Sequence, residues 1–221
     1  MTFRQDHWDC GGSLDGLLAG YALGALPRPV RRLVDAHLEM KPQAREFVHG
    51  LECLCSAKME KAPPAALSNR ETMLSAILAA EPAARPCCKA KAHGIEASLP
   101  RALTSYVGVP LDALRWRRIL PGLKEARLPE EDGCSVSLMQ IRAGTKVPQH
   151  THEGQEITLV LKGAFADETG RYGAGDIAIG DEALDHRPIV PQDEDCLCFI
   201  VIDGRLRLTG PVGGLVSRFF G

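Results

Sequence analysis

Three side chains in the second half of the 221-residue chain have types and a spacing that suit metal binding. His150 and His152 are two positions apart, and Glu156 follows four positions after the second histidine. Because side chains at i and i+2 of a β-strand point to one face, the two imidazoles would project in the same direction. A short turn would then bring the carboxylate beside them. Two imidazoles and one carboxylate can bind a first-row divalent metal ion and leave coordination positions open.

A third histidine, His186, is the candidate for a fourth ligand. It follows a tight turn at Gly175-Asp176 and a short apolar run. The strand after that turn would return His186 to the interior, where the other three side chains lie. We therefore expect one divalent metal ion, with zinc as the first choice and iron, manganese or nickel as alternatives, because three nitrogen donors and one oxygen donor suit all of them. The expected ligands are His150, His152, Glu156 and His186.

Glycines frame these residues at fixed distances. Residues 144–163 follow the pattern G-x5-H-x-H-x3-E-x6-G, and residues 173–188 contain a Gly-Asp turn and the late His186. The first segment resembles the first conserved motif of the cupin family, and the second resembles that family's looser second motif. The match covers about residues 105–205. The resemblance implies a cupin barrel, a double-stranded β-helix, that holds one metal ion through three histidines and one glutamate.

Short runs rich in β-branched and apolar residues, separated by glycine and acidic turns, extend from about residue 99 onward. The candidate strands are Ser135–Ile141, Gln155–Lys162, Gly163–Thr169, Asp176–Ile179, Arg187–Val190 and Cys196–Ile202. Many short strands at regular spacing are typical of a closed or sandwiched all-β domain. The basic run Arg115–Arg118 is interpreted as a solvated strand edge, because little other positive charge lies nearby.

Residues 1–82 carry apolar residues at helical spacing instead. We expect four short helices, the first ending at Pro27, the second opening with Pro29 in its first turn and the third following Pro42. The fourth is preceded by capping-box spacing at Ser68–Glu71. The apolar faces expected for the second and third helices are Leu33, Val34, His37 and Met40, and Phe47, Val48, Leu51 and Leu54. Together these helices predict a small helical bundle.

A segment rich in proline, alanine and lysine separates the helical pattern of the first half from the strand pattern of the second half. It has no apolar periodicity and is interpreted as an interdomain linker. The predicted fold is therefore α + β in two domains, with a helical domain at 1–82, a linker at 83–98 and a cupin domain at 99–221.

The combination of a helical module and one cupin resembles the ChrR family of cupin-containing anti-sigma factors. The residues that carry this resemblance are the segments 17–27, 34–38, 116–123 and 194–198. The resemblance implies that the helical domain holds an extracytoplasmic-function sigma factor. It also implies that the cupin domain takes part in releasing the sigma factor under singlet-oxygen or peroxide stress.

The helical half departs from the zinc-binding pattern of such modules, which have an early histidine and then H-x3-C-x2-C. The histidines could be His7 and His37, but the two cysteine positions hold Lys41 and Ala44. A structural zinc site usually needs four ligands, so we expect no zinc there and interpret His37 as a helix histidine packed against its neighbours. One face of the third helix could supply replacement ligands, namely His49 and Cys53. The cupin metal is then expected to be the only one in the chain.

The composition limits which classes of binding partner are expected. A net charge of −2 gives no electrostatic reason to expect direct nucleic-acid binding. No run approaches the roughly 18 apolar residues of a membrane span, and the N-terminus lacks the apolar core of a secretory signal. We therefore expect no membrane partner and a cytoplasmic location, where the eight cysteines stay mostly reduced. Cys196 and Cys198 share one face of a strand and are interpreted as buried small hydrophobes, with a redox-responsive pair as the alternative.

The first functional hypothesis is a transcriptional regulator of the anti-sigma type. The helical domain would bind a sigma factor, and the cupin metal would sense an oxidant or bind a small ligand. The alternative is a metal-dependent cupin enzyme, such as a dioxygenase, with helices as a lid or as a dimerisation element in a homodimer. The sequence contains neither a Ser-His-Asp arrangement for nucleophilic catalysis nor a phosphate-binding glycine loop.

Overall fold

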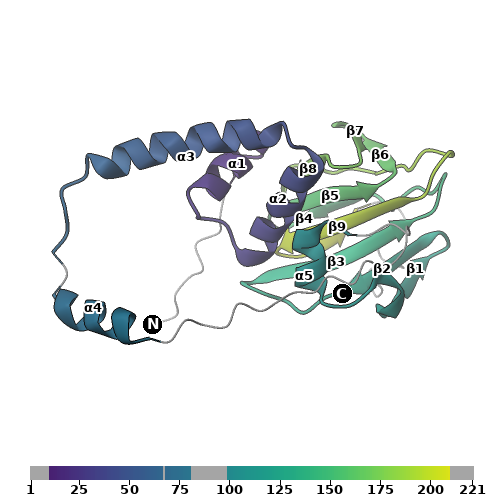
Figure 1. Cartoon of the computed structure of the whole chain (residues 1–221). Coiled ribbons are helices and arrows are strands. Elements are labelled where there is room, and N and C mark those ends of the chain that lie inside the picture. Colours follow the sequence, from purple (N-terminus) through teal and green to yellow (C-terminus); the bar gives the residue numbers. More distant parts are fainter. Residues whose placement is uncertain (1–9, 67, 81–98, 210–221) are drawn as a thin grey trace.

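The computed structural model describes residues 10–66, 68–80 and 99–209. Helices occupy the described part of the first half and a β-rich domain follows, as predicted (Figure 1). The predicted linker at 83–98, the candidate ligand His7 and the adjacent Cys87 and Cys88 lie outside the described residues. Among the described residues, no helix is both long enough and apolar enough to cross a membrane.

The helices of the first half are α1 (Leu14–Ala22), α2 (Arg28–Met40), α3 (Ala44–Glu60) and α4 (Arg70–Ala79). Local sequence accounts for some of their ends, although α1 ends at Ala22 and not at Pro27 as predicted. The Ser13 hydroxyl accepts a hydrogen bond of 3.1 Å from the Gly16 amide and caps α1. Pro29 lies in the first turn of α2, as predicted. The capping box expected at Ser68–Glu71 is wrong, because Asn69 is the residue that precedes α4 and its side chain makes no capping bond.

The apolar faces of α3 and α4 are largely exposed. Of the face predicted for α3, only Val48 is buried, whereas Phe47 and Leu54 are 44% and 66% exposed. No residue of α4 is buried, and Figure 1 shows this helix lying apart from α1, α2 and α3. Helical periodicity identified these apolar faces, but periodicity does not specify what covers them.

The β-rich domain begins with α5 (Arg101–Val107) and the short helical turn η1 (Leu111–Ala113). Its strands are β1 (Arg117–Leu120), β2 (Leu123–Arg127), β3 (Cys134–Ile141), β4 (His150–His152), β5 (Glu156–Lys162), β6 (Ala164–Asp167), β7 (Gly170–Gly173), β8 (Ile177–Gly180), β9 (Cys196–Asp203) and β10 (Leu206–Leu208). One antiparallel sheet has the order β1-β2-β3-β9-β5-β8, while β10 pairs with β4 and β6 pairs with β7. β1 is an edge strand, in agreement with the prediction for the basic run.

Strands β2, β7 and β10 were not among the candidate strands. Two further features of this domain contradict the sequence prediction. Arg187–Val190 is not a strand, and Ile189 forms only two isolated bridges there. Pro188 has no backbone N–H to donate, which interrupts a ladder at this point. The second difference is α5, which lies where only strands were expected. It begins after Pro100 and ends at Gly108, whose φ of 74° suits a helix C-terminus.

Helix α2 connects the helical region to the sheet. It contacts α5, β5 and β9, and Figure 1 shows it lying against the sheet beside α1. One hydrophobic cluster includes Leu33 of α2, Leu103 of α5 and Phe199 of β9, all completely buried. The two halves therefore share a core through this helix.

Candidate metal centre

The short strand β4 presents His150 and His152 on one face, as the two-residue spacing predicts. Both side chains are buried, at 4% and 1% exposure. Glu156 is the first residue of β5 and its side chain is 12% exposed. The turn between the two strands passes close to the backbone of Asp203, and a Cβ at Gly154 would collide with the Asp203 carbonyl. A glycine at this position allows the tight return that brings the carboxylate beside the imidazoles.

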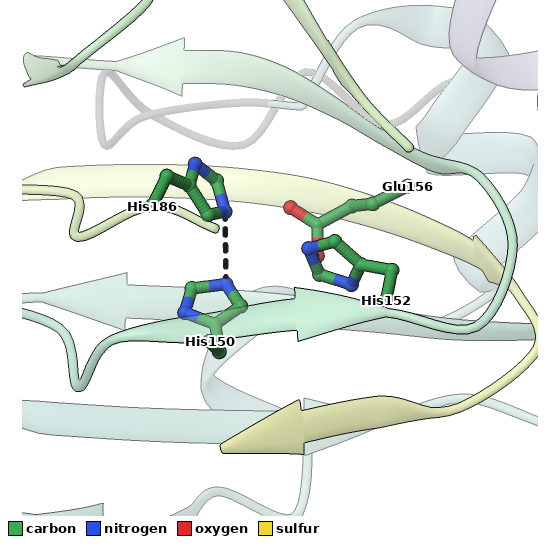
Figure 2. A group of neighbouring side chains, drawn as sticks. All are labelled: His150, His152, Glu156 and His186. Atoms are coloured by element: carbon green, nitrogen blue, oxygen red, sulfur yellow. Dashed lines mark hydrogen bonds and ion pairs between the residues drawn. The ribbon is translucent and has the colours of Figure 1, made fainter. Parts of the chain in front are cut away.

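His186 reaches the same place from a different part of the chain. Its backbone pairs with that of His150 through two hydrogen bonds, of 3.1 Å and 3.0 Å. Residues that oppose each other in an antiparallel pair have adjacent side chains, so this bridge sets the two imidazoles side by side. The ligand-type atoms of His150, His152, Glu156 and His186 all lie within 4.8 Å of one another. Figure 2 shows the four side chains converging from β4, from the start of β5 and from the segment after β8.

The spacing of the donor atoms suits a common ion. The Nε2 atoms of His150 and His186 are 3.0 Å apart, and Nε2 of His152 is 3.5 Å from Oε2 of Glu156. Two donors that each lie about 2.1 Å from one metal ion are separated by about 3.0–3.5 Å in octahedral or tetrahedral geometry. These two separations fall in that range.

Neighbouring acceptors fix which nitrogen carries the proton in two of the rings. Nδ1 of His150 is 2.7 Å from the Pro148 carbonyl oxygen, and Nδ1 of His186 is 2.7 Å from Oδ2 of Asp167. Both partners are acceptors, so Nδ1 carries a hydrogen in each ring, and in its neutral form each ring directs an Nε2 lone pair into the cluster. Two lone pairs that face each other repel unless a cation lies between them, which is the arrangement of metal-binding histidines with fixed outer partners.

His152 supports the same conclusion. Neither of its ring nitrogens has a hydrogen-bond partner within residues 10–66, 68–80 and 99–209, although the side chain is buried. Buried polar atoms in proteins are otherwise nearly always paired. Burial lowers the pKa of His152 and of His150, so both rings are neutral and available as ligands at neutral pH. The residues present therefore fit a metal ion.

Asp167 is a residue of this site that the sequence analysis missed. It lies at the end of β6, 19 positions before His186, and its side chain is only 2% exposed. It also accepts hydrogen bonds from the backbone and hydroxyl of Thr169. No motif spacing marks an outer partner of this kind, because its position depends on how the β6–β7 hairpin folds over the site.

A cavity of about 780 Å³ adjoins the cluster. His150, Glu156 and His186 lie in its wall, and the apolar part of the lining includes Met139, Phe165 and Ile200. This volume is in the range of sites for small molecules. The arrangement can therefore hold a metal ion in contact with space for a ligand.

Two thiols lie in the same interior. Cys196 and Cys198 of β9 are both buried, their sulfur atoms are 3.5 Å apart, and Cys198 lines the cavity. The hydrogen bond with Cys196, together with burial, raises the pKa of Cys198, which keeps this thiol protonated. Neither of these two cysteines is in a disulfide bond. Their burial agrees with the interpretation as small hydrophobes.

The positions of the incomplete zinc pattern do not form a metal site among the described residues, where the cupin cluster is the one group found. His37 is buried and packed in the core side of α2, as expected. Lys41 forms an ion pair with Asp176 of the cupin. The proposed replacement pair, His49 and Cys53, lies on an exposed face of α3 with its nitrogen and sulfur 3.7 Å apart.

The fold and the cluster define a cupin of the kind that can hold a metal ion, with helices attached at its N-terminal side. A family model described as the ChrR cupin-like domain matches residues 104–204. A curated relative, the anti-sigma-E factor ChrR of Cereibacter sphaeroides, is 38% identical over 208 residues, which cover 93% of this chain and 95% of the relative. The crystal structure of Rhodobacter sphaeroides SigE in complex with the anti-sigma ChrR contains a chain that is 36% identical, with a TM-score of 0.70 over 86% of this chain and 97% of that one. The chain belongs to the ChrR family of cupin-containing anti-sigma factors.

Proposed function

We propose that the protein is an anti-sigma factor that holds an extracytoplasmic-function sigma factor through its helical region and receives its signal through a metal-bound cupin. The observation that carries this proposal is the length of the match. The 38% identity to an anti-sigma-E factor extends over 93% of the chain and so includes the helices as well as the cupin. A relative that shared only the cupin would support a fold and not a function.

The exposed apolar side chains of α3 and α4 support a protein partner. The largest of them are Phe47, Leu54, Met59, Met73, Leu74, Ile77 and Leu78, with exposures from 43% to 77%. Apolar surface of this extent on two consecutive helices is typical of an interaction site. An isolated helix as short as α4 is marginal in water, so a partner that covers its apolar side chains would also stabilise it. A sigma factor bound there would have its polymerase-binding surface occluded.

The signal would enter through the cupin. His150, His152, Glu156 and His186 would hold one divalent ion, for which zinc is the first candidate. A metal ion held there would offer an open coordination position to an oxidant or a small molecule that enters the adjoining cavity. A ligand that binds one conformation better than another shifts the population toward it, here toward a form that releases the sigma factor.

A metal-dependent cupin enzyme is the second candidate, and the cavity beside the cluster is the observation that favours it. The expected result for an enzyme is turnover of a small substrate that is abolished in His152→Ala. The match along both halves to an anti-sigma factor favours the regulator.

The decisive experiment is co-expression with extracytoplasmic-function sigma factors of the same organism, followed by co-purification and metal analysis. We expect a stable complex and one bound divalent ion per chain, and His152→Ala should lose the ion. The proposed location is the cytoplasm, where sigma factors meet polymerase. Light scattering of the free protein would show whether it forms a homodimer. Failure to bind any such sigma factor would refute the proposed function.

A further inference from the structure

The last turn of α2 contacts the cupin turn that precedes β8. Nδ1 of His37 lies 2.7 Å from the carbonyl oxygen of Gly175, and Nζ of Lys41 lies 3.0 Å from Oδ1 of Asp176. His37 lies in the last turn of α2, and Lys41 is the residue that follows the helix, four positions later. Their contacts reach two adjacent residues of the turn. One of them is a buried hydrogen bond and the other is a partly exposed ion pair.

The turn is shaped to receive the helix. Gly175 has a φ of 88°, and a Cβ at this position would lie 2.7 Å from Cε of Lys41 and 3.2 Å from Cβ of Met40. The other carboxylate oxygen of Asp176 accepts a hydrogen bond of 2.8 Å from the Gly173 amide. The turn thus has a fixed geometry, and the positive φ of Gly175, together with the nearby Met40 Cβ, favours a glycine at this position.

The buried side chain of His37 is held by its hydrogen bond to the Gly175 carbonyl oxygen. Its side chain is 4% exposed, and burial lowers its pKa, so that the ring is neutral at neutral pH. Because the Gly175 oxygen can only accept, Nδ1 carries the hydrogen, and Nε2 has no hydrogen-bond partner among the described residues. An unpaired buried polar atom is unfavourable, and loss of the bond to Gly175 would leave both ring nitrogens of His37 without a partner among the described residues.

We propose that the C-terminal end of α2 is a metal-independent joint that fixes the helical region to the cupin. The contacts of His37 and Lys41 with the turn make this attachment, and no metal ion takes part in it. The joint goes beyond sigma binding, because it concerns how the two halves are held together. It also lies close to the metal centre. β8 runs from this turn to Gly180, where a Cβ would lie 3.6 Å from Cδ2 of His152. One short strand therefore connects the joint to the cluster.

The joint can be tested by hydrogen exchange on the full-length protein with a double-mutant cycle. The single variants are Lys41→Met and Asp176→Asn, and asparagine can still accept the bond from Gly173. The control is Arg32→Met, which removes a cation from the same helix whose ion-pair partner, Asp35, also lies on α2. We expect faster exchange in the last turn of α2 and in residues 173–176, by up to about five-fold for each single variant.

The double variant should exchange no faster than the faster single variant, because both remove the same ion pair. Arg32→Met should leave the exchange of both segments unchanged. Additive effects in the double variant, or unchanged exchange in the singles, would contradict the ion-pair part of the joint.

A second measurement tests metal independence and the buried bond. His37→Leu should raise exchange in the same segments by about ten-fold or more, since it removes a buried hydrogen bond. Its metal content should equal that of the wild type. A metal ion lost from His37→Leu, or unchanged exchange, would overturn the joint. Binding of a sigma factor to the wild type is measured in a separate co-purification experiment. A lack of binding there would refute the proposed function but would not change the hydrogen-exchange result.

Discussion

At the residue scale, each histidine of the cupin cluster except His152 is oriented by an acceptor outside the cluster. The Pro148 carbonyl fixes His150, and Asp167 fixes His186. Glu156 is oriented as well, because the Thr158 hydroxyl donates a hydrogen bond of 3.0 Å to its Oε1. These outer contacts hold the donor atoms in place before any ion binds, so their loss should weaken metal binding without removing a ligand.

The variant Asp167→Asn tests that role. The amide has no negative charge to strengthen the bond to His186, and its NH2 group can turn toward Nδ1. We expect metal affinity to fall by about 10–100-fold while all four ligands remain. Competition with a chelating dye measures the affinity. Asp112→Asn, an exposed change on η1, is the control, and an equal affinity in both variants would exclude a positioning role for Asp167.

The buried histidines also predict how stability depends on pH. Burial lowers the pKa of His37, His150 and His152 below the ordinary 6.5. As pH falls through 6.5, the unfolded chain takes up protons on these rings, but the folded metal-free protein does not until lower pH. The free energy of unfolding should therefore fall as pH falls below about 6.5, as measured by urea unfolding of the metal-free protein.

The matched variant for this pH effect is His37→Leu, in which one of the three rings is absent. Its stability should fall less steeply over the same pH interval. An equally steep fall would mean that His37 does not contribute.

At the element scale, α2 and α4 have opposite surroundings although both show apolar helical patterns. Seven residues of α2 are buried, among them Val30, Leu33 and Val34 with no exposed surface, whereas α4 has none. We therefore expect changes in α2 to lower stability and changes in α4 to affect binding.

The α2 prediction concerns Leu33→Ala. Truncation of a fully buried leucine leaves a cavity, so the free energy of unfolding should fall by about 3 kcal/mol. Leu54→Ala on α3 truncates a side chain that is 66% exposed and should change it by less than about 0.5 kcal/mol. Denaturant unfolding of both variants measures the difference, and equal effects would contradict the core assigned to α2.

The α4 prediction concerns Ile77 and Leu78, which are 67% and 77% exposed. The double change to aspartate would place charges in an apolar interface, so we expect at least a ten-fold loss of sigma-factor affinity, about 1.4 kcal/mol or more, with an unchanged melting temperature of the free protein. Glu71→Gln on the same helix is the control. Retained binding in Ile77→Asp/Leu78→Asp would remove α4 from the interface.

At the scale of the whole molecule, the helical region and the cupin share one hydrophobic cluster that runs from α1 through α2 and α5 to the sheet. Polar contacts reinforce this interface. The Glu39 carboxylate of α2 accepts hydrogen bonds from the Arg101 and Ala102 amides at the start of α5, and Arg28 contacts Glu131 and Asp132 before β3. The helical region should therefore depend on the cupin for its stability more than the cupin depends on the helices. The strands of the cupin pair with one another, whereas the helices lack such ladders.

Separate expression of the halves tests this dependence. A fragment of residues 1–80 exposes the apolar face of α2 that the sheet and α5 cover, so we expect it to be less helical than in the full chain and prone to association. A fragment of residues 99–221 should stay folded and keep its metal affinity. Circular dichroism, size-exclusion chromatography and metal titration report the outcome, and a helical fragment as stable as the full chain would show that the shared core is dispensable.

The sequence by itself determined the features that depend on local spacing. The i, i+2 pair of histidines, the framing glycines and the Gly-Asp turn were enough to predict the cupin and to select the four side chains that the structure brings together. Proline positions and apolar periodicity were enough to locate the four helices of the first half, although not α5. These features were readable because a strand or helix imposes its period on residues only a few positions apart.

The tertiary structure alone decided the rest. It placed Asp167 within hydrogen-bond distance of His186. It also brought His37 to the Gly175 carbonyl oxygen and Lys41 to the Asp176 carboxylate. It left Phe47 and Leu54 exposed, and it reduced Arg187–Val190 to isolated bridges. Each of these outcomes depends on which surfaces meet after the chain has folded. Contacts between residues far apart in sequence follow from that packing and from no local period.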